Sequence, residues 1–311
     1  MPEAPLILGI DGGGTKTRCV LGDDDSILGS GTGSGCSILR VGEACARDSL
    51  AGAIHEACVQ AGVSPQQISR TCAGVTGAAD DGIASLVQRL LIEIIGGAIE
   101  VIGDMEIALE SAFNGGPGIV LIAGTGSIAF GRNDRGESLR AGGWGRMISD
   151  EGSGHWIVIE ALRASLRAYD AGYNPRLLRK LMESLEARSV HDLAVRVNAN
   201  AAQDFASHFP VVLAAAEAGD PIATDLLDRA GRELAVPVNS IATQLFPGFG
   251  QVCIATHGGV FAASARVKSA FTAELKALYP RAGVLDIAID PALGALNRAR
   301  REFTIWHKNV K

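Results

Sequence analysis

The hydrophobic pattern at the start of the chain predicts a β-hairpin built around a glycine turn. Apolar residues fill 6–10 and resume at 19–21, and the positions between them are glycine or polar. Short apolar runs bounded by glycine are typical of strands joined by a tight turn. The acidic run 23–25 reads as a solvated turn, and a third short strand follows over 26–30. Glycine then alternates with serine and threonine over 29–35, without the G-x-G-x-x-G spacing, and we interpret this segment as a loop.

Apolar residues at helical spacing alternate with short apolar runs as far as residue 113. This pattern predicts helices interleaved with strands, and strands joined through helices pair in parallel. Ligands of such sheets lie at the carboxyl ends of the strands. Asp104 stands directly after one of these strands. The predicted helices are 42–61, 80–95 and 105–113, and the predicted strands are 69–76 and 100–103.

The opening pattern returns in the middle of the chain. After the glycine-rich break at 115–118, three apolar runs and two turns follow in the same order as at the start, so that 122–143 repeats 10–31. An internal repeat of this kind predicts one three-strand unit in each of two domains, facing each other across a cleft. The predicted strands of the second unit are 119–123, 128–131 and 137–141, with a glycine turn at 124–127.

The rest of the chain is predicted to be mainly helical, with two further strands. The composition suits closely packed α/β layers, because 47% of the residues are apolar but only 5% are aromatic. A length of 311 residues agrees with two domains. The predicted helices are 154–170, 174–187, 191–201, 205–218, 220–245, 260–279 and 291–302, and the predicted strands are 251–256 and 284–289.

Charge and cysteine content narrow the class of protein. A net charge of −6, with no run of basic residues before 298–301, argues against a nucleic-acid partner. The six cysteines form no C-x-x-C pair and have no histidines at metal-binding spacing, which is typical of reduced thiols in a cytosolic protein. The start of the sequence lacks the basic region and long apolar stretch typical of a signal peptide, and no uninterrupted apolar stretch of about 18 residues occurs, so we expect neither a signal peptide nor a membrane span. We therefore expect a cytoplasmic protein with no membrane partner.

The first glycine turn has the character of a phosphate site. Three consecutive glycines, Gly12–Gly14, lack side-chain bulk and can adopt positive φ, so backbone N–H groups can converge on an anion. Thr15 and Lys16 add a hydroxyl and an amine. The spacing differs from that of a Walker loop. Asp11 places an acid beside this anion site, which would be favourable if Mg²⁺ lay between them. The alternative is an ordinary glycine-rich turn.

Four motifs, taken in order, carry a resemblance to a known family. They are Asp11–Thr15, Gly124–Ser127, Gly143–Gly145 with Asp150–Ser153, and Gly258–Gly259. In this order they resemble the N-acetylglucosamine kinases of the BadF/BadG/BcrA/BcrD ATPase group, within the actin, hexokinase and heat-shock-chaperone superfamily. The resemblance runs from about residue 6 to residue 300.

The resemblance implies an α/β fold of two ribonuclease-H-like (actin-like ATPase) domains that close on ATP across an interdomain cleft. The last helix would return to the first domain. We therefore expect one domain over 1–116 plus 291–311 and another over 117–290. We also expect a homodimer formed through the helical part of the second domain.

The resemblance also implies roles for single residues. Asp11 would lie near Mg²⁺, through water, and Asp104 would be the base for the sugar hydroxyl. The first turn would hold the β- and γ-phosphates of ATP, the second turn would hold them from the other domain, and the last glycine pair would pack on the adenosine. The residues expected to bind ATP are Gly12, Gly13, Gly14, Thr15, Lys16, Thr125, Gly126, Gly258 and Gly259.

The small-molecule substrate implied is an amino sugar, N-acetylglucosamine, phosphorylated on its 6-hydroxyl. At Ser37 the family often carries an asparagine that contacts the sugar, so this chain departs from the pattern. Glucosamine or another hexose therefore stays open as the acceptor. The residues expected to line the sugar are Ser37, Asp104, Ser127, Ile128, Gly143, Trp144, Gly145 and Asp150.

Each of these residues also has a purely structural interpretation. Asp104 and Asp150 stand at predicted helix starts, where an acid is favoured as a cap or by the helix dipole. Trp144 could belong to a core, and Gly258–Gly259 could be only a turn. Two other classes of function also stay open. One is an ATPase that activates a partner enzyme through an iron–sulfur cluster, and the other is a non-catalytic sugar sensor.

Overall fold

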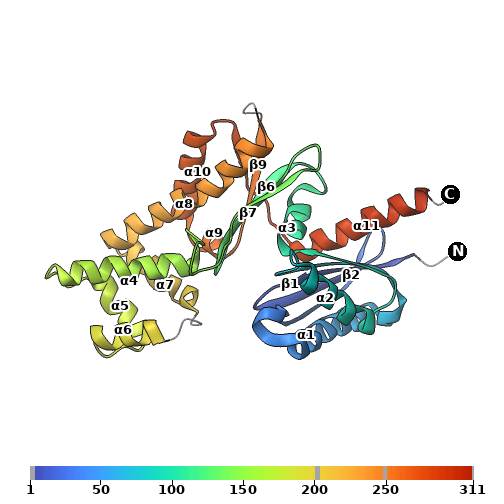
Figure 1. Cartoon of the computed structure of the whole chain (residues 1–311), viewed down its shortest axis with the longest axis horizontal. Coiled ribbons are helices and arrows are strands. Elements are labelled where there is room, and N and C mark those ends of the chain that lie inside the picture. Colours follow the sequence, from blue (N-terminus) through green and yellow to red (C-terminus); the bar gives the residue numbers. More distant parts are fainter. Residues whose placement is uncertain (1–3, 200–203, 248–250, 310–311) are drawn as a thin grey trace. The chain divides into compact units, whose positions relative to one another are not determined.

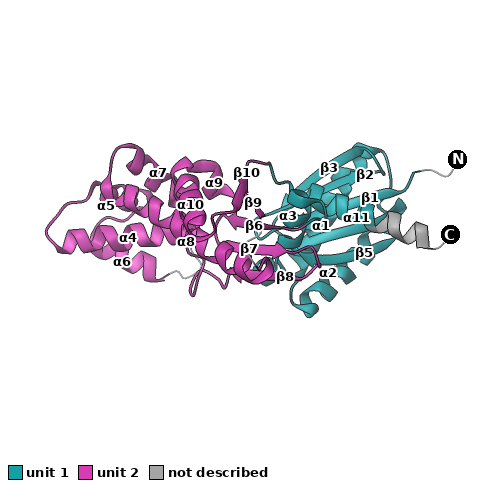
Figure 2. Cartoon of the chain, turned by 90° about the horizontal axis from the view of Figure 1, so that it is seen from above, with its two compact units in different colours: residues 1–116, 288–311 teal, residues 117–287 magenta. Residues whose placement is uncertain are grey.

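The chain divides into two compact units, each with its own five-stranded sheet (Figures 1 and 2). A computed structural model describes residues 4–199, 204–247 and 251–309. Unit 1 comprises residues 1–116 and 288–311, and unit 2 comprises residues 117–287. Unit 1 is therefore discontinuous, because its last segment follows unit 2 in the sequence.

The sheet of unit 1 is mixed, with strand order β3-β2-β1-β4-β5. The first three strands form an antiparallel meander, and β4 and β5 extend the sheet in parallel from β1. This confirms the predicted hairpin and the parallel pairing of strands that are joined through helices. The strands are β1 (Leu6–Gly12), β2 (Lys16–Gly22), β3 (Ile27–Ser34), β4 (Ile68–Val75) and β5 (Ala98–Gly103).

Helices cover both faces of this sheet. Alternate residues of a strand point to opposite faces, so Leu8 of β1 packs in the core under α1 and α2, whereas Ile7 packs with α3 and α11. A single 3₁₀ turn, Pro65–Gln67, precedes β4. The helices of unit 1 are α1 (Ile38–Ala61), α2 (Asp81–Ile94), α3 (Asp104–Phe113) and α11 (Pro291–Asn309).

The sheet of unit 2 repeats the topology of the first. Its order is β10-β9-β6-β7-β8, so β6, β7 and β8 correspond to β1, β2 and β3. The three-strand repeat expected from the sequence is therefore present in both sheets. The strands are β6 (Gly118–Ala123), β7 (Ser127–Arg132), β8 (Ser138–Gly142), β9 (Val252–His257) and β10 (Ala282–Leu285).

Helices between β8 and β9 and around the sheet complete unit 2, and they share one hydrophobic core with it (Figure 1). A 3₁₀ helix, η2 (Phe205–His208), leads into α7. The α-helices are α4 (Gly154–Asp170), α5 (Arg176–Ser184), α6 (Val190–Ala199), α7 (Phe209–Glu217), α8 (Pro221–Leu245), α9 (Gly259–Ala263) and α10 (Ala265–Leu278).

The predicted loop over 29–35 is wrong, because most of it belongs to β3. Gly29, Gly31 and Gly33 alternate along this strand on the face that meets α1. A Cβ atom on any of them would come closer than 3.0 Å to a backbone carbonyl oxygen of the helix. The glycine alternation is thus the period of a strand whose face leaves no room for side chains. Helix α1 also starts four residues before the predicted 42, and Gly42 kinks it with φ 78°.

Several predicted boundaries differ from the structure. The predicted helix 260–279 is two helices, because Ser264 leaves the helical conformation and its hydroxyl accepts the N–H of Val267 at 3.3 Å. The predicted strand 284–289 ends at Leu285, and the predicted helix 205–218 begins with a 3₁₀ turn. The end of the predicted helix 191–201 lies outside the described residues.

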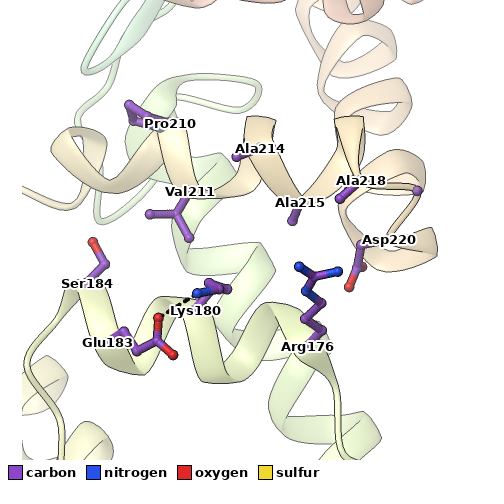
Figure 3. A pocket seen from close by; sticks show the side chains of 11 residues that line it. Arg176, Lys180, Glu183, Ser184, Pro210, Val211, Ala214, Ala215, Ala218 and Asp220 are labelled. Atoms are coloured by element: carbon purple, nitrogen blue, oxygen red, sulfur yellow. Dashed lines mark hydrogen bonds and ion pairs between the residues drawn. The ribbon is translucent and has the colours of Figure 1, made fainter.

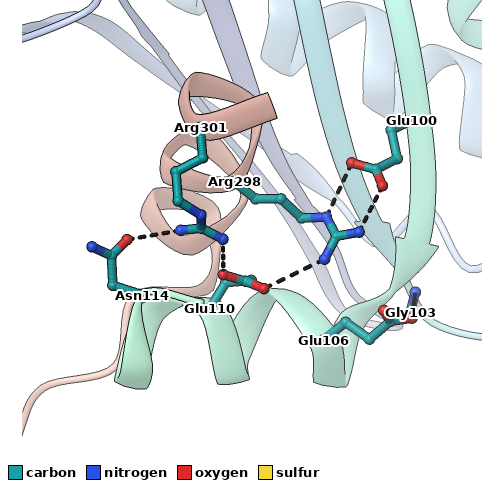
Figure 4. Close-up of polar contacts among 7 residues, drawn as sticks. All are labelled: Glu100, Gly103, Glu106, Glu110, Asn114, Arg298 and Arg301. Atoms are coloured by element: carbon teal, nitrogen blue, oxygen red, sulfur yellow. Dashed lines mark hydrogen bonds and ion pairs between the residues drawn. The ribbon is translucent and has the colours of Figure 1, made fainter. Parts of the chain in front are cut away.

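A buried acid joins α3 to the C-terminal helix (Figure 4). Glu110 on α3 is only 1% exposed and accepts hydrogen bonds from Arg298 and Arg301 on α11. Arg298 also forms a two-pronged ion pair with Glu100 on β5, at 2.7 and 3.0 Å. These carboxylates raise the pKa of the Arg298 guanidinium. Because a buried carboxylate without partners is costly, α11 and α3 are held together as a pair.

We predict that Gly31→Ala destabilises the protein by about 1–3 kcal/mol, because its new Cβ would overlap the carbonyl oxygen of Ala53. Gly52→Ala is the matched control on α1, where a Cβ would meet nothing within 4 Å. Gly52→Ala should stabilise the protein by about 0.5–1 kcal/mol, since alanine loses less backbone freedom than glycine at an exposed helical position. Urea unfolding of both variants measures the difference. Equal stabilities would contradict the close packing of β3 on α1.

Candidate active site

The turn after β1 presents two free backbone donors. The N–H of Gly13 donates to the carbonyl of Lys16 at 2.9 Å, and the carbonyl of Gly13 accepts the N–H of Cys36 at 3.0 Å. Within the described part of the chain, the N–H groups of Gly14 and Thr15 have no acceptor. Neighbouring backbone N–H groups without acceptors form a small concave anion site.

The glycines of this turn are needed for space and not for unusual backbone angles. None of Gly12–Gly14 uses the positive φ that glycine can adopt. A Cβ on Gly12 would lie 2.7 Å from the sulfur of Cys36, and a Cβ on Gly14 would lie 2.9 Å from a guanidinium nitrogen of Arg40. The turn is therefore closely backed by the segment that leads into α1.

Asp11 is an acid within a cluster of charges. Burial, and then the nearby carboxylates Asp104 and Asp290, raise the pKa of Asp11 to about 6, while Arg18 and Lys16 act in the opposite direction. The register of the hairpin places Arg18 opposite Asp11, and the Arg18 guanidinium forms a 2.6 Å ion pair with Asp290. The site therefore holds more negative charge than its two cations balance.

Asp104 is not a helix cap. Gly103 occupies the cap position of α3, and the Glu106 carboxylate accepts the Gly103 N–H at 3.2 Å. One oxygen of Asp104, Oδ2, accepts the hydroxyl hydrogen of Thr76 at 2.6 Å. The other, Oδ1, accepts the N–H of Met105 at 3.0 Å. The capping interpretation therefore fails, and the carboxyl group is held by donors from two elements.

The carboxyl ends of β1, β4 and β5 bring these groups to one edge of the sheet. The N–H of Thr76 donates to the carbonyl of Gly12 at 3.0 Å, which ties the end of β4 to the glycine turn. Val75 pairs with Gly103, so Thr76 and Asp104 leave their strands side by side. Ser37 lies at the start of α1, 3% exposed, and its hydroxyl does not cap that helix.

Unit 2 builds the equivalent turn against the start of α4. The N–H of Gly124 donates to the carbonyl of Gly126 at 2.9 Å. The N–H groups of Gly154 and His155 donate to the carbonyls of Gly124 and Thr125, at 2.8 and 3.3 Å. Among the described residues, nothing accepts the N–H groups of Thr125 and Gly126. The second turn thus repeats the pair of free donors found in the first.

Asp150 is a buried acid in an unusual backbone conformation. It is 8% exposed with φ 68°, a region that non-glycine residues rarely adopt. Burial raises the pKa of Asp150, and the N–H groups of Ser127 and Gly145 partly offset this by hydrogen bonding to the carboxylate. The helix is capped by Ser153, whose hydroxyl accepts the Trp156 N–H. The cap interpretation of Asp150 therefore fails as well.

The glycine-rich loop before Asp150 exposes an aromatic ring. Gly143 has φ 68°, and a Cβ there would lie 2.5 Å from Ile128, so these two residues are in contact. The side chain of Trp144 is 64% exposed, and the Arg140 guanidinium lies 4.1 Å from the ring centre. Trp144 therefore does not belong to a core.

Gly258 lies next to the second turn. With φ 106° it precedes α9, and a Cβ there would overlap the carbonyl of Ala123, the residue before the turn. A Cβ on Gly259 would meet nothing within 4 Å, so the outer side of this residue is open. Within unit 2, the structure thus brings together the end of β6, the second turn and this glycine pair.

Several residues at these sites were not predicted from the sequence. Arg18 and Thr76 contact or adjoin the predicted acids, and the hairpin register alone could have found Arg18. Asp290 lies about 270 residues from Arg18 in the chain, and no local pattern marks it. Met147 and Ile148, each 80% exposed, extend the apolar surface of the loop that carries Trp144. The presence of two large apolar residues in a glycine-rich loop is the sequence signal that could have identified them.

A separate groove lies in the helical part of unit 2 (Figure 3). Its volume is about 780 Å³, and it runs between α5 and α7. One wall is apolar, with Val211 and Ala215, and the other carries Arg176 and a Lys180–Glu183 ion pair at 2.8 Å. None of the predicted site residues lines it. No described helix is both long and apolar enough to cross a membrane.

Two sheets of one topology, each with a glycine turn after its first strand, form a duplicated α/β fold of the actin-like ATPase class. The chain belongs to the BadF/BadG/BcrA/BcrD ATPase family, whose sequence profile matches residues 8–299. It is 32% identical to an N-acetylmuramic acid/N-acetylglucosamine kinase of Clostridium acetobutylicum, over 95% of this chain and 98% of the relative. It is 30% identical to an N-acetyl-D-glucosamine kinase of Dictyostelium discoideum, over 93% and 96%.

A solved structure shares the whole architecture. The putative N-acetylglucosamine kinase of Chromobacterium violaceum superposes with a TM-score of 0.77 at 27% sequence identity. The likeness covers 95% of this chain and 99% of that one. The expected α/β fold and the expected family are therefore confirmed.

We predict that Asp11→Asn stabilises the metal-free protein above pH 7. The folded-state pKa of Asp11, about 6, lies above its ordinary value of 3.8. Folding therefore favours the protonated carboxyl group of Asp11. This contribution to stability is complete below pH 3.8 and is lost as the pH rises through 6. The difference between these two pKa values corresponds to a gain in the free energy of unfolding of at most about 3 kcal/mol for Asp11→Asn at pH 8, and to little gain at pH 4.

Urea unfolding at both pH values, without nucleotide or divalent cations, measures this effect. Asp25→Asn, in the exposed turn after β2, is the control for removing a surface charge. A gain for Asp11→Asn that is the same at pH 4 and pH 8 would contradict the buried, crowded environment of Asp11.

Proposed function

We propose that the chain transfers the γ-phosphoryl group of ATP to the 6-hydroxyl of N-acetylglucosamine. The observation that carries the proposal is Asp104. Its carboxyl group stands at the carboxyl ends of the parallel strands β4 and β5, is held by two donors and does not cap its helix. Membership of an ATPase family and the names of two amino-sugar kinases among the relatives support the reaction class.

The glycine turns are proposed to bind the phosphates of ATP. In unit 1 the donors are the free N–H groups of Gly14 and Thr15, with Lys16 beside them. In unit 2 they are the N–H groups of Thr125 and Gly126. Gly258 packs against Ala123 next to the second turn, and Gly259 has an open side on which the adenosine would pack. Fixed backbone dipoles of this kind stabilise the charge that develops on a phosphoryl group.

The residues around Asp11 fit a magnesium ion. Asp11 and its neighbouring carboxylates supply oxygen donors in an environment with excess negative charge. In the described part of the chain, no three acidic, histidine or cysteine side chains are grouped closely enough to hold a metal alone. Asp11 would therefore hold Mg²⁺ mainly through water, together with the phosphates. When bound, the ion neutralises charge on the phosphates.

Asp104 would orient the sugar hydroxyl and accept its proton. Phosphoryl transfer has a loose transition state, so the protein contributes mainly position and electrostatic stabilisation. A base must lie within hydrogen-bonding reach of the hydroxyl in a fixed orientation. The two donors to Asp104, from Thr76 and Met105, provide that orientation in unit 1.

The sugar is proposed to contact Ser37 and Asp104 in unit 1 and a loop cluster in unit 2. Asp150 is the most specific of these groups, because a buried carboxylate is an efficient acceptor for sugar hydroxyl groups. The exposed ring of Trp144 offers an apolar face to a sugar ring. The unit 2 residues in this proposal are Ser127, Ile128, Gly143, Trp144, Gly145 and Asp150.

A second acceptor is supported by a specific observation. The Clostridium acetobutylicum relative is named for both N-acetylmuramic acid and N-acetylglucosamine. Ser37 is smaller than the asparagine that the family often carries at the sugar, and a smaller side chain there would suit a bulkier or differently substituted acceptor. Glucosamine and other hexoses stay open for the same reason.

Four of the six cysteines are poorly suited to hold an iron–sulfur cluster, whereas Cys45 is exposed and Cys253 is partly buried. Cys19, Cys36, Cys58 and Cys72 are buried in unit 1, and burial raises the pKa of each thiol. Cluster ligation requires thiolates. The placement of Asp104 likewise favours an enzyme over a sensor, which has no need of a base. We further propose that the kinase acts in the cytoplasm as a homodimer formed through the helices of unit 2.

We expect ADP release to be fastest with N-acetylglucosamine. The test compares kcat/KM for N-acetylglucosamine, N-acetylmuramic acid, glucosamine, glucose and N-acetylmannosamine, with Mg²⁺ and with EDTA. EDTA should abolish turnover, and phosphorus NMR should assign the product as a 6-phosphate. ATP consumption that does not depend on any sugar would overturn the proposal in favour of a partner-directed ATPase.

Asp104→Asn should keep ATP binding but lower kcat by about 10²–10⁴-fold, because the amide cannot accept the proton. Calorimetric titration with ATP and a coupled ADP assay measure the two properties. Asp81→Asn is the matched control, since Asp81 is the first residue of α2 as Asp104 is of α3. Near wild-type kcat in Asp104→Asn would remove Asp104 from the reaction.

A further inference from the structure

We propose that Thr76 is a positioning residue, whose hydroxyl fixes the carboxylate of Asp104 in its working orientation. The inference rests on the proposed function of Asp104 as the base. Thr76 follows β4 directly, and its hydroxyl donates to Oδ2 of Asp104 at 2.6 Å. This is a short, charge-assisted hydrogen bond between residues that follow neighbouring parallel strands.

The backbones on both sides of this hydrogen bond are fixed. The N–H of Thr76 donates to the carbonyl of Gly12 at 3.0 Å, so the residue is anchored to the first glycine turn. Asp104 begins α3, which the buried Glu110 ties to α11. Neither Cα can shift easily, and the remaining freedom lies in the Asp104 side chain.

The terminal torsion of an aspartate is broad, so a carboxyl group needs donors to hold its plane. Asp104 has one donor on each oxygen: the N–H of Met105 on Oδ1, and the Thr76 hydroxyl on Oδ2. Each oxygen keeps a second lone-pair direction for an incoming hydroxyl. Without Thr76, one oxygen loses its only described partner and the plane can turn. Fewer molecules then present the base at the angle that the reaction needs.

Among the described residues, no other contact of Thr76 requires a hydroxyl group at this position. Thr76 is half-buried, and among the described residues the hydroxyl bonds only to Asp104. Valine has nearly the same shape as threonine without the donor, and serine has the donor without the methyl group. These two substitutions therefore separate hydrogen bonding from packing.

Strand β4, which Thr76 directly follows, offers a matched control. Thr71 lies on β4, is 0% exposed, and its hydroxyl has no hydrogen-bond partner among the described residues. Thr71→Val removes a threonine hydroxyl from the same strand without breaking a hydrogen bond to Asp104. It should leave the kinetic constants unchanged.

The experiment measures kcat and both KM values for Thr76→Val, Thr76→Ser and Thr71→Val, with the sugar that the wild type uses best. Thr76→Val should lower kcat by about 10- to 100-fold, the usual effect of losing a hydrogen bond to a charged group, and leave the KM for ATP unchanged. Thr76→Ser should restore most of kcat. In the Asp104→Asn background, Thr76→Val should cause no further loss, because both changes act through one group.

Three outcomes would overturn the proposal. A kcat of Thr76→Val within twofold of wild type would show that the hydroxyl is not needed. A further loss in the Asp104→Asn background would show that it acts elsewhere. If Thr76→Val and Thr76→Ala both fail to fold while Thr76→Ser folds, Thr76 is a structural residue. A failure of Asp104→Asn to lose activity would instead overturn the proposed function, so the two failures are distinguishable.

Discussion

The unit 1 site depends on parallel strands that end at the same level. Because β1, β4 and β5 are hydrogen-bonded in parallel, their carboxyl ends deliver Asp11, Thr76 and Asp104 to one edge of the sheet. The bond from the Thr76 N–H to the Gly12 carbonyl continues this pairing beyond the last ladder residues. A shift of one residue in the β4–β5 register would point the following side chains to the other face and separate them. The positions of the proposed functional side chains in unit 1 therefore depend on strand register.

Close backbone approach gives that edge its rigidity. Gly9 on β1 and Gly294 on α11 sit where a Cβ would overlap the backbone of α11 and α3, respectively. Helix α11 can therefore lie directly on the sheet and on α3 at once. The same device brings α1 down onto β3 through its alternating glycines. High glycine content in this chain thus serves two ends: turns that expose N–H groups, and helix–sheet contacts that leave no room for side chains.

The architecture could be predicted from the sequence better than the local details could. Apolar runs and glycine turns correctly indicated the hairpins and their repeat, because short-range patterning controls both. The segment 29–35 was wrongly predicted to be a loop. Alternating glycines are recognisable as a strand only when the helix that packs on them is known. Asp104 was found because it follows a strand, and only the structure separated it from the cap at Gly103. The Arg18–Asp290 pair joins segments about 270 residues apart, and no local signal exists for such a contact.

The contacts of Glu110 bear on how the chain is made. Its two arginine partners lie 188 and 191 residues later, on α11, which follows the whole of unit 2 in the chain. Until α11 has been synthesised, Glu110 lacks these partners, so the native packing of this face of α3 waits for a segment that is made after unit 2. Unit 2 is continuous in sequence and can complete its own core first. Unit 1 can therefore complete its packing only after unit 2 has been synthesised, although most of unit 1 precedes unit 2 in the chain.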